Sequence, residues 1–286
     1  AVARAVEDLG FAGLYRSDHV TNSEPPDHDS LELWTSLTWL ASNTKRIEFG
    51  PMVSPVSFRH PVTTARIASA VDDLSGGRLR LGLGAGWEER EHTNYSYDLL
   101  PLPKRLERYA EGLEVTTRLL KSDQPIAFDG AYYHLHDAIL LPRPNRAGGP
   151  PIVIGGGRGV LPLAARYADE WNIAFARPQA FAALSRHLDQ LLTGQGREQG
   201  AVRRTLMTNL VFAVDQAGLD AKLREKGTAI EDLRHRGIVV GTADAVIAQL
   251  DELAEAGVQT VMLQWLDLDD LAGLSALASV ILPRFT

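Results

Sequence analysis

Short apolar runs alternate with helical patterns along nearly the whole chain, and this rhythm constrains the fold more than any other feature. The runs lack the strict alternation of apolar and polar residues that marks a strand with one solvent-exposed face, so each predicted strand is expected to be buried on both faces. Strands of this kind, separated by helices, form a parallel sheet covered by helices, and the sequence therefore predicts an α/β fold. The predicted strands are residues 11–17, 46–54, 79–86, 151–157, 170–176, 206–214 and 260–266.

The predicted helices carry recognisable end signals. Gly10 suits the left-handed cap of a first helix, Pro61 suits a first helical turn, and Gly76 and Gly257 follow the last apolar residues of two later helices. The predicted helices cover residues 1–9, 31–42, 61–74, 106–120, 160–168 and 246–254.

Seven strands of this type favour a closed barrel over an open sheet, and a (β/α)₈ TIM barrel needs eight. Because the chain starts with a helix, we expect the first strand to lie upstream of residue 1, in a natural chain that begins roughly 15 to 25 residues earlier. Residues 1–286 are expected to form a single domain, since such barrels commonly reach about 250 residues. Residues 87–104 and 122–150 are expected to be irregular, and long loops on a barrel usually shape its pocket.

Composition excludes several classes of function. The 29 Lys and Arg residues against 36 Asp and Glu residues give a formal charge of −7, with no basic stripe to bind nucleic acid. The absence of cysteine excludes disulfides and thiolate metal sites. No apolar stretch approaches the roughly 20 residues that span a bilayer, and no export signal precedes the first helix, so we expect a cytoplasmic protein without a membrane partner. The expected partner is a small-molecule substrate, and a homodimer is the expected assembly because dimers are the commonest oligomers.

Four short motifs follow predicted strands and are therefore expected at the carboxyl end of a barrel, where active sites lie. His19 can exchange a proton near neutral pH, and Asp18 can fix its tautomer or bind backbone amides; the alternative is a capping aspartate beside a solvated histidine. The motifs are SDH at 17–19, GPMVS at 50–54, GAGW at 84–87 and GGG at 155–157.

Two of these motifs are rich in glycine. Gly155, Gly156 and Gly157 precede a predicted helix and would expose N–H groups to a phosphate, the alternative being a tight turn. The GAGW motif lacks the third glycine of a dinucleotide fingerprint, which disfavours a Rossmann site. Its glycines would let a planar ligand approach with Trp87 as one wall, or Trp87 would belong to the core beside a bulge.

Other residues favour structural interpretations. His134 and His136 share a strand face but lack a third ligand at metal spacing, so no metal site is predicted. Trp34, Trp39 and Leu40 are expected in the core or in an oligomer contact, and the acidic helix at 251–255 is expected to face solvent.

Taken together, five segments resemble the bacterial-luciferase-like flavin-dependent oxidoreductases, in order and spacing from residue 1 to about 266. The five segments that show the resemblance are GFAGLYRSDHV, FRHP, LSGGRLRLGLGAGW, GPPIVIGGG and ARYADEWN. The SDH ending, LLPRPNRAGGPP and VGTADAVIAQLDELAEAGVQTVMLQWL look most like the branch that uses the deazaflavin coenzyme F420.

The resemblance implies a (β/α)₈ barrel and assigns candidate roles. It places His19 near the reactive face of the deazaflavin as the catalytic residue, with Asp18 beside it, and a non-proline cis peptide among Pro51, Met52 and Val53 that backs the ring. The other residues that it implies for cofactor binding are Gly84, Ala85, Gly86, Trp87, Gly155, Gly156 and Gly157, with no metal ligand.

Two departures from the family pattern bear on function. Sugar-phosphate dehydrogenases of the family carry a glutamate after G-x-G where this chain has Trp87, which puts sugar-phosphate oxidation in doubt. The usual ADGW is ADEW here, with Glu170 in place of glycine.

The resemblance thus implies an oxidoreductase that passes a hydride between F420 and a small organic substrate, with His19 exchanging the proton. One alternative is a monooxygenase that uses reduced FMN and oxygen, and another is a non-catalytic flavin-binding protein. A hydrolase using Asp18 and His19 is a remote alternative, since no nucleophile is placed beside them.

Overall fold

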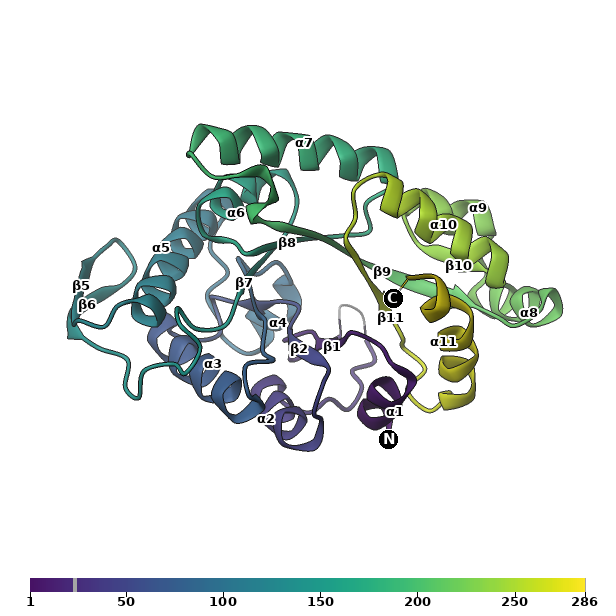
Figure 1. Cartoon of the computed structure of the whole chain (residues 1–286), viewed down its shortest axis with the longest axis horizontal. Coiled ribbons are helices and arrows are strands. Elements are labelled where there is room, and N and C mark those ends of the chain that lie inside the picture. Colours follow the sequence, from purple (N-terminus) through teal and green to yellow (C-terminus); the bar gives the residue numbers. More distant parts are fainter. Residues whose placement is uncertain (23–24, 286) are drawn as a thin grey trace. The chain divides into compact units, whose positions relative to one another are not determined.

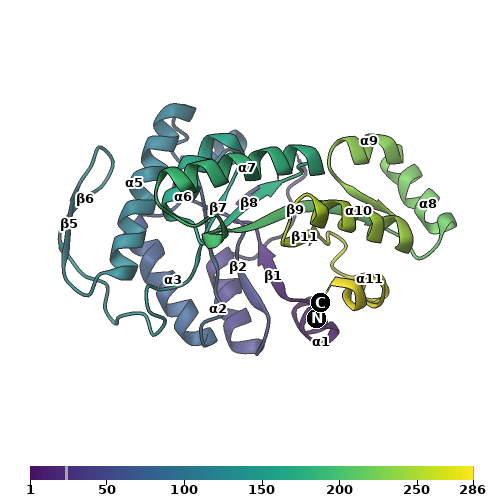
Figure 2. The same cartoon turned by 45° about the horizontal axis from the view of Figure 1, so that its top comes forward.

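The computed structural model describes residues 1–22 and 25–285 and divides into two compact units (Figures 1 and 2). Residues 13–155 and 167–169 form the first unit, called here the N-terminal unit. Residues 1–12, 156–166 and 170–286 form the second, called the C-terminal unit. The expectation of a single domain stays a prediction.

Parallel strands run through the N-terminal unit. Gly13 of β1 lies opposite Glu48 of β2, Phe49 of β2 hydrogen-bonds to the chain just before β4, and β4 pairs with both β3 and β7. Because all these pairs are parallel, the carboxyl ends of the strands meet at one edge of the unit. The strands are β1 (Gly13–Arg16), β2 (Glu48–Pro51), β3 (Ser54–Pro55), β4 (Leu81–Gly84) and β7 (Ile152–Gly155).

Three long helices pack in sequence order along these strands (Figure 1): α2 (Leu33–Asn43), α3 (Pro61–Ser75) and α5 (Leu102–Lys121). Pro61 stands at the start of α3 as predicted, and Gly76 closes the helix with a φ of 70°. The interior lies between these helices and the strands, where Phe49, Leu83 and Tyr109 are buried and the Tyr109 hydroxyl donates to the carbonyl of Leu83.

Both segments expected to be irregular contain regular structure. Residues 87–104 hold a short helix, α4 (Glu89–Asn94), and residues 122–150 hold an antiparallel hairpin of β5 (Ile126–Asp129) and β6 (His134–Ala138). The expectation was wrong in both places because α4 is too short and polar to show an apolar stripe, and the hairpin is held by tertiary contact. Glu111 of α5 accepts hydrogen bonds from the backbone N–H groups of Ala131, Tyr132 and Tyr133.

The C-terminal unit also has a parallel strand group, with β9 (Arg203–Phe212) between β8 (Glu170–Ala174) and β11 (Thr260–Gln264). β9 begins three residues before the predicted start at 206, because tertiary contacts satisfy its polar residues. Arg204 bonds to Asp189 and Ser185 of α7 (Pro178–Gly194) and to two carbonyl groups.

A strand absent from the prediction, β10 (Val239–Gly241), pairs with the last residues of β9. With α8 (Gln216–Lys226) and α9 (Ile230–His235), it encloses a small apolar cluster. The cluster contains Val211, Ala213, Leu219, Leu233, Ile238 and Val240. A run this short gives no periodic signal, so only the pairing with β9 defines it as a strand.

The remaining elements of the C-terminal unit are helical. Gly10 closes the first helix in the left-handed region with a φ of 96°, as predicted. These elements are α1 (Val2–Leu9), η1 (Arg158–Val160), α6 (Leu161–Tyr167), η2 (Gln199–Ala201), α10 (Ala243–Glu255) and α11 (Leu271–Phe285).

Burial separates the three residues expected in the core or in an oligomer contact. Trp34 and Leu40 are buried in the N-terminal unit, whereas Trp39 on the same helix is 47% exposed and is not a core residue.

Across residues 1–22 and 25–285, no helix combines the length and hydropathy needed to cross a bilayer.

Candidate functional site

The imidazole of His19 is held by a buried glutamate. His19 follows β1 at the carboxyl edge of the N-terminal unit, and its Nδ1 lies 3.0 Å and 3.1 Å from the two carboxylate oxygens of Glu91. Since a carboxylate can only accept, Nδ1 carries the hydrogen and Nε2 is left as the proton-exchanging atom. Glu91 Oε2 also accepts the N–H of Val20 at 3.0 Å, so one carboxylate fixes both the ring and the backbone beside it.

Helix α4 positions Glu91 for this contact. The Glu88 side chain caps the helix by accepting from the N–H of Arg90, and the Glu88 carbonyl lies 2.6 Å from His92 Nδ1. On its other side, His92 Nε2 lies 2.8 Å from Ser57 Oγ. The bond between His92 and Ser57 links α4 to the loop after β3, and Glu91 on the same helix is 1% exposed.

The surroundings of His19 favour its protonated form. The hydrogen bond that His19 donates to Glu91 is the largest influence and raises the pKa of His19 above its ordinary value, while partial burial opposes the rise. The negative charges of Glu91, Glu88 and Asp18 raise the pKa further. His19 is exposed, as the solvated-histidine alternative expected, but its ring is also bonded to a buried acid, so its role stays a prediction.

Asp18 is buried and paired with an arginine. Ser54 Oγ donates to Asp18 Oδ2 at 2.6 Å, and Arg59 approaches the same carboxylate through both of its terminal nitrogens. Arg59 also bonds to Glu32, which caps α2. Asp18, directly before His19, thus ties the segment after β1 to Ser54 and Arg59 beyond β2.

Met52 and Val53 follow β2 directly, and the peptide bond between them is cis, which confirms the expected position of the cis bond. The N–H of Met52 donates to the carbonyl of Arg16 at 2.7 Å. A Cβ on Gly84 would lie 2.6 Å from Val53 Cγ2, and one on Gly155 would lie 2.9 Å from Val53 Cγ1. Both glycines therefore make room for Val53; their contact with a ligand stays a prediction.

Trp87 lies next to His19, with ring centroids 5.7 Å apart and planes at 80°. The indole is 61% exposed, so the alternative of a core tryptophan is wrong. The carbonyl of Gly86 accepts from Arg105 at 2.7 Å, and Gly86 has a φ of 85° that favours glycine. The backbone that carries Trp87 is therefore fixed while its ring remains accessible.

Gly156 and Gly157 belong to the C-terminal unit, where they precede η1. Gly156 has a φ of 139° and donates its N–H to the carbonyl of Asn172, which fits the tight-turn interpretation. No heavy atom lies within 4 Å of a Cβ built on Gly157, so this position is open. Phosphate binding by Gly155, Gly156 and Gly157 stays a prediction.

Glu170, the departure from the ADGW pattern, is completely buried at the start of β8. Its carboxylate accepts from Thr205 Oγ1 at 2.8 Å, and Asn172 donates to the same hydroxyl at 2.9 Å. The substitution thus adds a hydrogen-bonded acid to the interior of the C-terminal unit.

Two further features contain none of the predicted cofactor-binding residues. His134 and His136 both lie on the exposed face of β6, and His134 pairs with Asp129.

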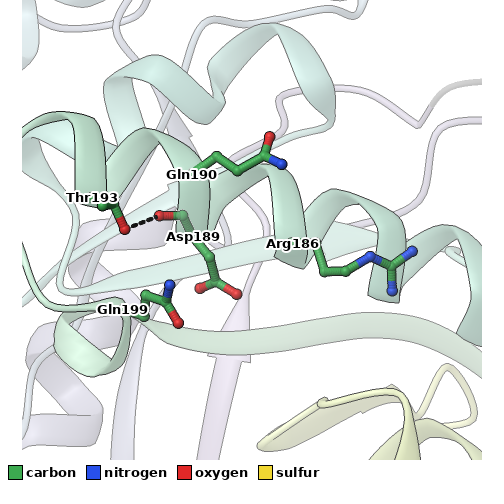
Figure 3. A pocket seen from close by; sticks show the side chains of 5 residues that line it. All are labelled: Arg186, Asp189, Gln190, Thr193 and Gln199. Atoms are coloured by element: carbon green, nitrogen blue, oxygen red, sulfur yellow. Dashed lines mark hydrogen bonds between the residues drawn. The ribbon is translucent and has the colours of Figure 1, made fainter.

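A hollow of about 490 Å³ beside α7 is lined by Arg186, Asp189, Gln190, Thr193 and Gln199 (Figure 3).

Sequence reasoning missed three residues that the structure brings to this site: Glu91, Ser54 and Arg59. Ser54 ends the GPMVS segment and Arg59 lies in the FRHP segment. Both segments were recognisable in the sequence, but neither predicted that these two side chains bind Asp18. Glu91 is one of three glutamates in the EEREH segment at 88–92, and no local signal distinguishes it from its exposed neighbour Glu89.

Comparison with known proteins identifies the family. The family model described as luciferase-like monooxygenase matches residues 1–260. The chain belongs to this family. An F420-dependent glucose-6-phosphate dehydrogenase from Kineococcus radiotolerans is 30% identical over 217 residues, which cover 74% of this chain and 63% of the relative. A 4-hydroxyprotoasukamycin monooxygenase from Streptomyces nodosus subsp. asukaensis is 37% identical over 134 residues, or 47% of this chain and 35% of the relative.

Among solved structures, an F420-dependent secondary alcohol dehydrogenase with an F420–acetone adduct matches with a TM-score of 0.87 at 18% identity, covering 100% of this chain and 93% of that one. At this identity the match shows the fold alone. The luciferase-like chain therefore has the predicted (β/α)₈ class of fold, and it spans less than two thirds of the two curated relatives described above.

Proposed function

We propose that this luciferase-like protein is an oxidoreductase that transfers a hydride between coenzyme F420 and a small organic substrate. The observation that carries the proposal is the His19–Glu91 pair, whose partly exposed imidazole is oriented with Nε2 as the atom left for proton exchange. F420 dependence in the names of both the dehydrogenase relative and the structural match supports this coenzyme.

The residues after β2 and β4 fit a planar ring. Met52 and Val53 are partly exposed, and Gly84 and Gly155 leave the space that keeps the Val53 side chain in place. Val53, Met52 and the backbone of residues 84–86 would hold the ring. When bound, the deazaflavin supplies or accepts the hydride.

The chain's own groups handle the proton. Nε2 of His19 gives a proton to the substrate oxygen in the reducing direction and takes one in the oxidising direction. Glu91 acts as a positioning residue, because its carboxylate fixes the tautomer and stabilises the imidazolium. The Trp87 ring lies beside the imidazole with its plane at 80° to it, so it would line one side of the proton-exchanging group.

Replacing His19 tests this function. His19→Ala is expected to keep the affinity for F420 and to slow turnover by about 10²- to 10⁴-fold, the usual contribution of a general acid or base. Coenzyme affinity is measured by fluorescence titration and turnover by the absorbance of the coenzyme. His136→Ala, which removes an exposed histidine of β6, is the control. Unchanged turnover in His19→Ala would remove the assigned role.

A second candidate is a monooxygenase that uses reduced FMN and oxygen, which the monooxygenase relative favours. Separate titrations with F420 and FMN distinguish the two, because only one coenzyme should bind tightly. Tight binding of FMN without binding of F420 would overturn the first proposal in favour of the second.

A further inference from the structure

Two of the exposed side chains beside His19 are apolar. Trp87 is 61% exposed with its ring 5.7 Å from the imidazole, and Val20, the residue after His19, is 43% exposed. An exposed aromatic side chain next to an oriented polar group is typical of a site that binds the apolar part of a small molecule and positions one of its polar atoms.

The charged groups nearest to the imidazole are acidic. Glu91 bonds to it directly, and the charges of Glu88 and Asp18 also reach it. Glu91 lies in α4, Glu88 caps that helix and Asp18 follows β1, so two separate segments of the chain bring negative charge to the imidazole.

The arginines of the neighbouring segments are already bound to acceptors of the protein. Arg59 bonds to Asp18 and to Glu32. Arg90 of α4 bonds to both oxygens of Asp27, at 2.7 Å and 2.8 Å. These guanidinium groups would have to leave carboxylates in order to bind an anion.

Arg105, on the first turns of α5, is engaged in the same way. It donates to the carbonyl of Gly86 at 2.7 Å and to that of Leu100 at 3.1 Å. A phosphate monoester needs several charge-assisted donors to replace its hydration. Among the described residues of the N-terminal unit, those next to His19 instead offer indole, valine and carboxylates.

We infer that the surface formed by Trp87, Val20 and His19 takes an uncharged ketone or alcohol with an apolar body, and that it rejects phosphate esters. This inference rests on the proposed function and names its substrate class. In the reducing direction the ketone gains a hydride at carbon from reduced F420 and a proton at oxygen from His19 Nε2, giving the alcohol and oxidised coenzyme. The class therefore differs from the sugar phosphate named for the dehydrogenase relative.

A matched pair of probes tests the inference: 4-hydroxyacetophenone and 4-acetylphenyl phosphate share the ketone and differ by the phosphate. Binding of each to the F420-loaded protein is measured by saturation-transfer NMR, and reduction is followed with reduced F420. The uncharged ketone is expected to bind at least tenfold more tightly than the phosphate ester. Glucose 6-phosphate is included as a second anionic probe.

Variants connect the preference to Trp87. Trp87→Ala is expected to weaken ketone binding by roughly threefold to tenfold, the usual worth of one aromatic contact. Trp39→Ala, which removes an exposed tryptophan from α2, should leave ketone binding unchanged. Thermal unfolding of both variants shows whether they are folded.

The outcomes separate this inference from the function on which it rests. Failure of the wild-type protein to bind F420 overturns the proposed function. Binding of F420 together with equal or tighter binding of either phosphate ester, or with no binding of the ketone, overturns the inference and leaves the function standing. Loss of ketone binding in folded Trp39→Ala to the same extent as in Trp87→Ala also overturns it.

Discussion

Glu91→Gln removes the charge that orients His19 while keeping the size and shape of the side chain. The wild-type carboxylate serves two donors, His19 Nδ1 at 3.0 Å and the N–H of Val20 at 3.0 Å. A glutamine oxygen can still accept from one of them, but its NH₂ group cannot accept from the other. The variant is therefore expected to lower the pKa of His19 relative to the wild type.

The size of the effect on stability follows from the two bonds. A hydrogen bond to a buried charged group contributes about 1.5–3 kcal/mol, and the bond to Val20 is of this type. The bond to His19 is worth less, about 0.5–1 kcal/mol, because the imidazole is partly exposed and screened by solvent. Since one neutral bond survives, Glu91→Gln should lower the free energy of unfolding by about 1–2 kcal/mol and Glu91→Ala by about 2–4 kcal/mol.

The pH dependence has a defined sign. The folded pKa of His19 is raised above its unfolded value of 6.5, so the stabilisation from its protonated form is fully present below pH 6.5. That stabilisation is lost as the pH rises through the folded pKa. The difference in unfolding free energy between wild type and Glu91→Gln should therefore be largest below pH 6.5 and shrink at higher pH, leaving the contribution of Val20.

Urea unfolding at a series of pH values measures this difference, and NMR titration of the His19 ring proton measures its pKa, with His19→Ala assigning the resonance. Glu89→Gln, on the exposed face of the same helix, is the control and should change neither quantity. An unchanged or higher pKa of His19 in Glu91→Gln, or a stability difference independent of pH, would refute the reasoning.

Two further substitutions test the surroundings of His19 by urea unfolding. Asp18→Ala should destabilise the protein by about 1.5–3 kcal/mol, because Arg59 loses its charged bonds to the buried Asp18 and keeps only the exposed Glu32; a loss below about 1 kcal/mol would show that the pair is not needed. Gly84→Ala should cost about 1–3 kcal/mol and weaken F420 binding, because the new methyl group would meet Val53 at 2.6 Å. Gly194→Ala, with nothing within 4 Å of its added Cβ, is the matched control, and equal effects from the two glycine variants would contradict the packing argument.

Much of the fold could be predicted from local patterns. Apolar runs without alternation predicted parallel strands, and Gly10, Pro61 and Gly76 marked helix ends where the structure has them. These signals are readable because burial of a strand or a helix face imposes a period on consecutive residues. Elements without such a period were missed, as α4 and β10 show.

The sequence by itself determined that His19 follows a strand and lies at the carboxyl edge of parallel strands. Only the tertiary structure decided which acid it meets, since Glu91 is 72 residues away and its pattern matches that of exposed Glu89. It likewise decided that Arg59 and Ser54 meet at Asp18 and that Trp87 faces solvent. The physical reason is that the period of a segment specifies which face is buried, whereas the partner of a polar side chain depends on how distant loops pack together.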